Sequence, residues 1–139
     1  MFDRAQIETW LATRHEHHGR ADWAAIRAKD GAFLGEAVLN ELDPDNESVN
    51  YRVWLAGPQV FGQGYGTEIT RLVIDYALYT VGLHRVSLRV YDFNSRAQRV
   101  YEKCGFSHEG RLREAFRWDD QWHDELLMAV LHSDPRPNG

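Results

Sequence analysis

The chain has little cysteine, no long apolar run and no excess of positive charge, and each absence excludes something. Its one cysteine, Cys104, cannot form an intramolecular disulfide, so the fold depends on its core and not on covalent cross-links. No apolar run approaches the roughly 20 residues that a bilayer-spanning helix needs. The first residues lack the basic and apolar stretches of a secretion signal, so we expect a cytoplasmic protein without a membrane partner.

The charge balance is mildly acidic, with 16 Lys and Arg against 21 Asp and Glu and a formal charge of −5. Non-specific nucleic-acid binding needs a concentrated basic surface, so we expect no nucleic-acid partner. The sign weakly favours a cationic or amine ligand. With 139 residues, 43% of them hydrophobic, the chain is long enough for one domain spanning 1–139, and 132–139 form a polar tail.

The beginning of the sequence predicts a short helix. Asp3 is a residue type that caps helices. Apolar residues follow it with helical spacing at Ile7, Trp10 and Leu11. We therefore expect the chain to start on a helix, followed by a polar, histidine-rich stretch.

An antiparallel meander should follow. Asp30-Gly31 is a strong hairpin signal between the apolar runs 23–26 and 33–39. Residues 49–55 then alternate between apolar and polar side chains, which predicts a third strand.

The second half of the sequence predicts helices and strands in alternation. Apolar residues recur with helical spacing from Ile69 to Thr80, and Gly82 should end that helix. A strand is expected over 86–91, and Ser95 with Gln98 forms a capping box for a helix ending at Gly105. The runs 111–118 and 122–131 predict a final hairpin.

The glycine-rich segment before the first long helix is a candidate anion site. Three glycines alternate in Phe61-Gly62-Gln63-Gly64-Tyr65-Gly66-Thr67, so several backbone N–H groups can face one ligand. The segment lacks the lysine of a Walker loop, and it follows a meander, whereas a dinucleotide fingerprint opens an early βαβ unit. On spacing alone, an anion site and a tight connection without a ligand are equally good interpretations.

Five blocks in fixed order make the sequence resemble the GNAT acetyltransferase superfamily, in the branch with ribosomal-protein N-terminal and diamine acetyltransferases. The blocks are 51–55, 62–68, 94–106, 109–113 and 123–126. The resemblance implies an α/β (α+β) fold, with a mixed, mostly antiparallel, bent sheet and helices on both faces. It also implies that the strand and helix with which such proteins usually open are missing.

The resemblance further implies a site for acetyl-CoA and no metal. The residues that would bind the cofactor are Val53, Trp54 and Leu55 for the pantetheine, Phe61, Gly62, Gln63, Gly64, Tyr65, Gly66 and Thr67 for the pyrophosphate, and Asn94 through its side-chain amide. The family usually has Gln or Arg where this chain has Phe61. One polar contact with the cofactor is therefore expected to be lost.

Tyr101 matches the tyrosine that protonates the departing thiolate in such enzymes. A phenol with a reference pKa of about 10 is protonated at neutral pH and can donate. Without the resemblance, packing on the inner face of its helix would be the simpler explanation. The identity of the general base stays open. Relatives often have a glutamate at the position of Asn50, and an asparagine cannot accept a proton. Glu36, Glu47 or an ordered water molecule are the alternatives.

Two other groups of residues invite a functional reading. The histidines at 15, 17 and 18 lack the further ligands of a metal site, and His123 beside Asp124 resembles a base with its orienting carboxylate, although a surface role is the better interpretation. Four tryptophans, at 23, 54, 118 and 122, occupy strand positions that usually build cores. For Trp54, lining an acceptor pocket is an equal alternative.

Together these observations predict an acetyl-CoA-dependent N-acetyltransferase with an amine acceptor, and a homodimer is one candidate assembly. A protein N-terminus is the first choice of acceptor. A polyamine or another small amine is the alternative, and a catalytically silent acyl-CoA-binding module is the competing class.

Overall fold

The computed structural model describes residues 20–135, together with the backbone of residues 9–17. Its elements, in chain order, are β1 (Thr9–His17), β2 (Arg20–Arg27), β3 (Phe33–Asp43), β4 (Ser48–Leu55), the short 3-10 helix η2 (Pro58–Val60), α1 (Tyr65–Asp75), the π-helical turn η3 (Tyr76–Val81), β5 (Arg85–Tyr91), α2 (Ser95–Lys103), β6 (Ser107–Trp118) and β7 (Gln121–Leu131). The predicted meander, the two later helices, the strand between them and the final hairpin are all present.

The strands form one mixed sheet in the order β1-β2-β3-β4-β5-β7-β6. All neighbouring pairs are antiparallel except β4 with β5, which is parallel. The predicted mixed, mostly antiparallel sheet is therefore confirmed.

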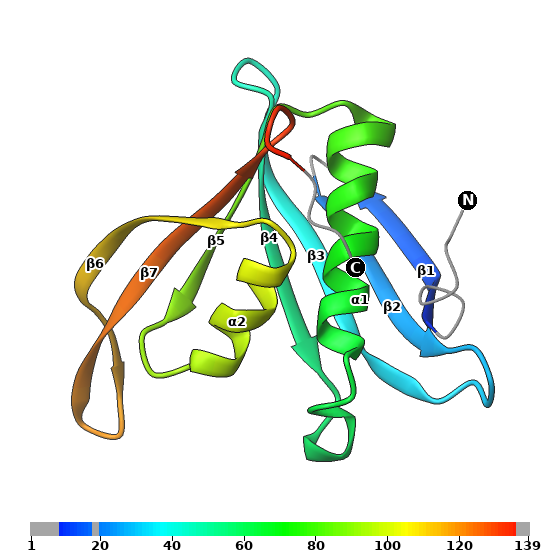
Figure 1. Cartoon of the computed structure of the whole chain (residues 1–139), viewed down its shortest axis with the longest axis horizontal. Helices are drawn as coiled ribbons and strands as arrows, with labels where there is room; N and C mark the ends of the chain where they lie inside the picture. Colours follow the sequence, from blue (N-terminus) through cyan, green and yellow to red (C-terminus); the bar gives the residue numbers. More distant parts are fainter. Residues whose placement is uncertain (1–8, 18–19, 136–139) are drawn as a thin grey trace.

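The parallel pair β4–β5 separates along its length. Ser48 pairs with Arg85, Val49 with Val86, and Asn50 with Ser87, and the described part of the chain shows no further pair between these strands. Figure 1 shows β4 and β5 meeting at one end and diverging toward their carboxyl ends. The sheet thus contains a V-shaped opening, with β4 on one side and β5 on the other.

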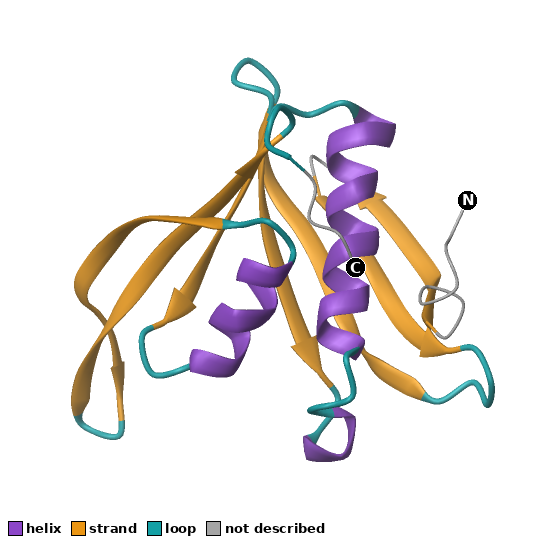
Figure 2. Ribbon diagram, in the orientation of Figure 1, coloured by secondary structure: helices purple, strands orange, loops and turns teal. Residues whose placement is uncertain are grey.

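Both helices lie on the same face of the sheet (Figure 2). Tyr51 on β4 reaches both of them, because its hydroxyl lies 3.0 Å from Oγ1 of Thr70 on α1 and its ring meets that of Tyr101 on α2. Among residues 20–135 no helix covers the opposite face. The expectation of helices on both faces is therefore wrong for the described residues: the predicted helices α1 and α2 share one apolar layer.

The predicted N-terminal helix is wrong where it can be compared. Residues 1–8 lie outside the described part, but residues 9–11, including Trp10 and Leu11, belong to β1. β1 pairs antiparallel with β2 from Thr9 opposite Arg27 to His17 opposite Arg20. The edge of β2 supplies hydrogen-bond partners for the backbone of β1. This pairing outweighs the weak helical tendency of three apolar residues with helical spacing.

Glycines flank the continuous helical segment formed by α1 and η3. Gly64 precedes it in the left-handed region, with φ 83°, and Gly82 follows η3 with φ 88°. The helix starts at Tyr65, four residues before Ile69, where the predicted helical spacing begins. The apolar stripe packs into the core, with Ile69, Val73 and Ala77 fully buried.

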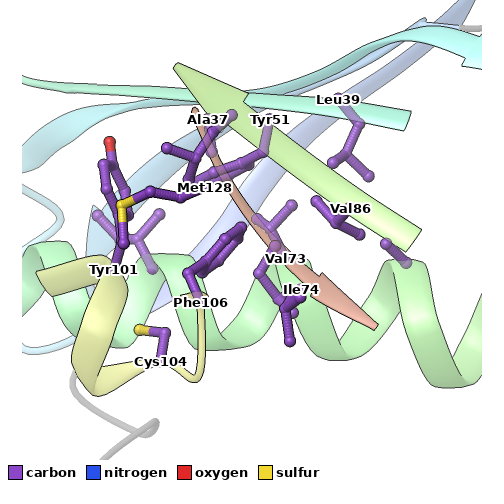
Figure 3. Packing of buried hydrophobic residues seen from close by; sticks show 14 of the residues in the cluster. Ala37, Leu39, Tyr51, Val73, Ile74, Val86, Tyr101, Cys104, Phe106 and Met128 are labelled. Carbon is purple, nitrogen blue, oxygen red and sulfur yellow. The ribbon is translucent and has the colours of Figure 1, made fainter. Parts of the chain in front are cut away.

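One hydrophobic core lies between the sheet and the two helices (Figure 3). Cys104 is buried in it, and so is Trp23, as predicted. Trp118 and Trp122 lie outside the core, 60% and 57% exposed, so their expected core packing is wrong. They flank the left-handed turn residues Asp119 and Asp120 at the tip of the β6–β7 hairpin.

Candidate functional site

The edge of β4 that faces the V is the first part of the candidate site. β4 pairs with β3 along its length, whereas beyond Asn50 the described residues give it no strand partner on the β5 side. The backbone of Val53, Trp54 and Leu55 lies on this unpaired stretch. An extended ligand carrying amide groups could therefore hydrogen-bond to it as an added strand would.

The position of that edge depends on a glycine in the neighbouring strand. Gly35 on β3 pairs with Leu55, and a Cβ at Gly35 would overlap the backbone carbonyl oxygen of Trp54. The absence of a side chain lets β3 and β4 approach closely at the open end of the V. Gly35 was not singled out from the sequence, because a lone glycine in a strand does not reveal what lies opposite it.

The glycine-rich loop leads into the first turn of α1 without a side-chain cap. Gly62 and Gly64 both have positive φ, 74° and 83°, and a Cβ on either would meet nothing within 4 Å. Backbone conformation, not lack of space, therefore requires glycine there. The first intrahelical bond runs from the amide of Glu68 to the carbonyl of Gly64, so the three preceding amides, at 65–67, point out of the helix end.

The first turn of α1 lies between β4 and α2. A Cβ at Gly66 would stand 3.8 Å from both Leu55 Cδ1 and Val100 Cγ2. The Cys104 thiol, near the end of α2, donates to the carbonyl of Thr67 at 3.6 Å. The structure thus brings together three segments that the sequence analysis had assigned to one site, namely 53–55, 61–67 and 94–106.

Tyr101 of α2 packs against the core, and its hydroxyl has no hydrogen-bond partner among the described residues. Its ring meets Tyr51 at 6.4 Å and Phe106 at 5.8 Å between centroids, and the side chain is 7% exposed. Figure 3 shows the hydroxyl pointing away from Cys104. Burial, followed by the nearby Cys104, raises the pKa of Tyr101 to about 12, which keeps it a proton donor.

Asn94, and not the predicted Ser95, caps α2. Its Oδ1 accepts from the amide of Ala97 at 3.2 Å, while Gln98 Nε2 donates to the carbonyls of Tyr91 and Asp92. The capping box was therefore placed one residue late. The cap uses the oxygen of the Asn94 amide, so its Nδ2 group is the part that can reach a ligand.

The structure separates the candidates for a general base. Asn50 donates to Oδ1 of Asn40 at 2.8 Å, at the point where the V opens. Glu47 lies at the closed end, where its carbonyl accepts from the amides of His84 and Arg85. Glu36 lies at the open end, where its Oε1 accepts from Trp54 Nε1 at 3.2 Å.

The face opposite the helices carries aromatic side chains that the sequence analysis had not grouped. Because side chains alternate along a strand, Tyr51 faces the helices and Trp54 faces the other way, and Trp54 is 51% exposed. This finding favours its acceptor-side reading over core packing. At the end of β5, Tyr91 stacks between Phe116 and Phe93 at 4.1 and 5.4 Å. The sequence signal for this aromatic group was the spacing of two between aromatic residues, at 91 and 93 and at 116 and 118.

His123 is not paired with Asp124. Asp124 instead accepts from Arg111 at 2.6 Å and from the backbone amide of Glu114, and both contacts lower the pKa of its carboxyl. His123 Nδ1 lies 3.9 Å from Asp92 Oδ1, and its ring meets Phe93 edge on. The arrangement agrees with a structural role at the hairpin.

Within residues 20–135 and the backbone of 9–17, no group of three His, Cys, Asp or Glu side chains is placed to hold a metal. His18 lies outside the described residues, and the side chains of His15 and His17 are not described. None of the described helices combines the length and apolar character that a membrane span requires.

Comparison with known proteins assigns the chain to a family. The model of the acetyltransferase (GNAT) domain matches residues 1–107. Spermidine N(1)-acetyltransferase of Vibrio cholerae is 27% identical over 123 residues, which are 88% of this chain and 70% of that protein. The probable N-acetyltransferase YjcK of Bacillus subtilis is 40% identical over 73 residues, which are 52% of this chain and 40% of that protein.

Solved structures agree with this assignment. A chimera of the spermidine N-acetyltransferase SpeG from Vibrio cholerae and hSSAT superposes with a TM-score of 0.78 at 27% identity, covering 83% of this chain and 68% of the other. The curated relatives are longer than this chain, and it spans 61% of the spermidine N(1)-acetyltransferase of Escherichia coli. With a family model matching well over half its length and a shared sheet topology, the chain belongs to the GNAT acetyltransferase family.

Proposed function

We propose that this protein transfers an acetyl group from acetyl-CoA to a primary amine of a polyamine or another small amine. One observation carries the proposal: the V between β4 and β5 opens where the first turns of α1 and α2 begin, with Tyr101 on the helix side. Three groups occur together at this opening. They are a free strand edge for a chain of amides, outward-pointing helix amides for a phosphate, and a phenol that can protonate a leaving group.

The cofactor would bind on the helix side of the V. The free edge at Val53, Trp54 and Leu55 suits the two amides of pantetheine. The amides at 65–67 and the positive end of the α1 dipole suit the pyrophosphate. At the start of α2, Asn94 Nδ2 can donate a hydrogen bond to the cofactor, because the cap uses Oδ1. All three groups are backbone or neutral, so none of them carries a formal charge.

Bound acetyl-CoA supplies a thioester carbonyl that a neutral amine attacks directly. The C–S electron pair would go to sulfur, the Tyr101 hydroxyl would donate the proton that neutralises the thiolate, and the phenolate would regain a proton from water. Its pKa of about 12 keeps the phenol protonated at any physiological pH. The proton lost by the amine must leave on the opposite side of the sheet, where Glu36 is better placed than Glu47.

The acceptor would approach from the face without helices. Trp54, which is 51% exposed, lies on that face, and Glu36 Oε1 accepts a hydrogen bond from its indole N–H. An exposed aromatic face and a carboxylate are the groups that attract an alkylammonium ion. The sequence favoured a protein N-terminus, but the similarity to two spermidine N-acetyltransferases supports the polyamine better.

A thiol-release assay with acetyl-CoA tests the proposal. Spermidine and spermine should support turnover with a higher kcat/KM than short peptides with a free N-terminus. Turnover with peptides but with no polyamine would overturn the acceptor assignment. Binding of acetyl-CoA without thiol release from any amine would favour a silent binding module.

Matched variants separate the acceptor side from the cofactor side. Trp54→Ala should raise KM for spermidine several-fold and leave the Kd for acetyl-CoA unchanged, because only the side chain faces the acceptor. Trp122→Ala is the control, since that tryptophan is similarly exposed but lies on the β6–β7 hairpin. Equal effects of the two substitutions would remove Trp54 from the site.

A further inference from the structure

The loop residue Phe61 and Arg96 of α2 form a contact that sequence comparison did not predict. The Arg96 guanidinium carbon lies 3.8 Å from the centre of the Phe61 ring. At position 61 the resemblance predicts a polar Gln or Arg, but this chain has the aromatic Phe61. A cation therefore stands next to the residue whose polar side chain is missing.

The direction of the Arg96 side chain follows from the packing of α2. Residues four apart lie on the same face of a helix, and Val100, four residues after Arg96, faces the first turn of α1 at Gly66. Arg96 thus extends the row that faces the glycine-rich loop, one turn nearer its start. The aromatic ring fixes the planar guanidinium by stacking.

Arg96 is placed against the local preference of its helix. The first turn of α2 contains this cation and no acidic residue, although the positive end of a helix dipole disfavours cations. Arg27, Arg85 and Arg111 are paired with carboxylates, whereas Arg52, Arg99 and Arg113, like Arg96, are not. Arg96 has no ion pair and no hydrogen bond with any described residue. A side chain that goes against a local preference without a compensating partner marks a candidate functional position.

We infer that Arg96, held by Phe61, binds the pyrophosphate of coenzyme A and replaces the polar side chain that relatives carry at the start of the loop. The inference rests on the proposed function and adds a charged contact to its backbone amides. The guanidinium can donate two parallel hydrogen bonds to phosphate oxygens.

Calorimetric titration of the full chain with free coenzyme A tests this inference without measuring turnover. Arg96→Ala should raise the Kd by about tenfold or more, as expected for loss of a charge-assisted hydrogen bond. The same penalty should persist with 3′-dephospho-coenzyme A, which keeps the pyrophosphate, and vanish with pantetheine, which lacks it. Arg99→Ala, one turn further along α2 and exposed, is the matched control and should bind like the wild type.

A second variant tests the role of the ring. Phe61→Leu keeps an apolar side chain but removes the aromatic face, so it should weaken coenzyme A binding only in the presence of Arg96. In the Arg96→Ala background, Phe61→Leu should have no further effect. Additive losses would show that Phe61 acts independently and would overturn its role as a support.

The outcomes also separate this inference from the proposed function. A wild type that binds no coenzyme A overturns both. A wild type that binds and acetylates, with Arg96→Ala binding within twofold of it, overturns the inference alone. A penalty that is equal for pantetheine, or that disappears with 3′-dephospho-coenzyme A, also overturns it, because Arg96 would then act on another part of the molecule or on the fold.

Discussion

The rings of Tyr51 on β4 and Tyr101 on α2 meet edge to face, with centroids 6.4 Å apart and planes at 86°. The Tyr51 hydroxyl is satisfied by Thr70 Oγ1 at 3.0 Å, whereas the Tyr101 hydroxyl has no partner among the described residues. Two buried tyrosines side by side thus differ in what their hydroxyls do. Tyr51 joins β4 to both helices, and Tyr101 has a hydroxyl available for a ligand.

This difference predicts opposite effects of two conservative substitutions. Tyr101→Phe should lower kcat by about 100-fold, in the range expected for removal of a general acid, with the Kd for acetyl-CoA unchanged. Tyr51→Phe should leave kcat nearly unchanged and lower the free energy of unfolding by about 1 kcal/mol through loss of one buried hydrogen bond. Steady-state kinetics and denaturant titration measure both. A kcat effect of Tyr101→Phe no larger than that of Tyr51→Phe would refute the assignment.

The pKa of Tyr101 predicts how stability changes in alkali. Burial raises this pKa to about 12 and raises that of Tyr51 well above 10. Between pH 10 and 12 the unfolded chain releases the phenolic proton while the folded protein keeps it, so the free energy of unfolding falls as pH rises. From Tyr101 alone the loss by pH 12 is about 2 kcal/mol.

Denaturant titrations at pH 8 and pH 11.5 check this expectation. Tyr101→Phe should show a smaller decline in stability than the wild type over this interval. Tyr79→Phe, at an exposed position, serves as the control and should decline as the wild type does. If the free energy of unfolding fell equally in the wild type and in Tyr101→Phe, the Tyr101 phenol would titrate equally in the folded and unfolded states.

Gly35 should be intolerant of any side chain. A Cβ there would overlap the Trp54 carbonyl oxygen, so Gly35→Ala must push β4 away from β3. We expect a loss of more than about 2 kcal/mol in unfolding free energy, and a higher Kd for acetyl-CoA because the displaced backbone is the proposed pantetheine edge. Gly110→Ala on β6 is the control, since its Cβ would make an ordinary contact, 3.7 Å from Leu127. Full stability of Gly35→Ala would contradict this placement of β4.

Substitutions at Asn94 separate its cap from its proposed cofactor contact. Asn94→Ala removes the bond to the Ala97 amide and should cost about 1 kcal/mol of stability. Asn94→Asp keeps a capping oxygen but loses the amide N–H groups, so it should fold normally and bind acetyl-CoA more weakly. Thermal unfolding and calorimetry measure the two effects. Normal cofactor affinity in Asn94→Asp would limit this residue to the cap.

Local sequence determined those features that depend on near neighbours in the chain. The Asp30-Gly31 hairpin, the alternation over 49–55, and the helical spacing before Gly82 each predict an element that the structure contains. The glycine-rich loop was also found, because positive φ at Gly62 and Gly64 restricts those positions to glycine. The predicted helix at the start failed, since a strand edge in β2 competes with weak helical spacing there.

The tertiary structure alone decided what lies across the V. The sequence could name Tyr101, but only packing shows that its hydroxyl is left without a partner while that of Tyr51 is used. It also showed that Trp54 faces the side without helices, that Gly35 lies against the Trp54 carbonyl, and that Arg96 stacks on Phe61. The contacts Gly35–Trp54 and Phe61–Arg96 join residues 19 and 35 positions apart, and the chemistry of one partner does not specify the other. The sequence by itself determined the parts of the site, and the long-range packing of strands and helices determined their arrangement.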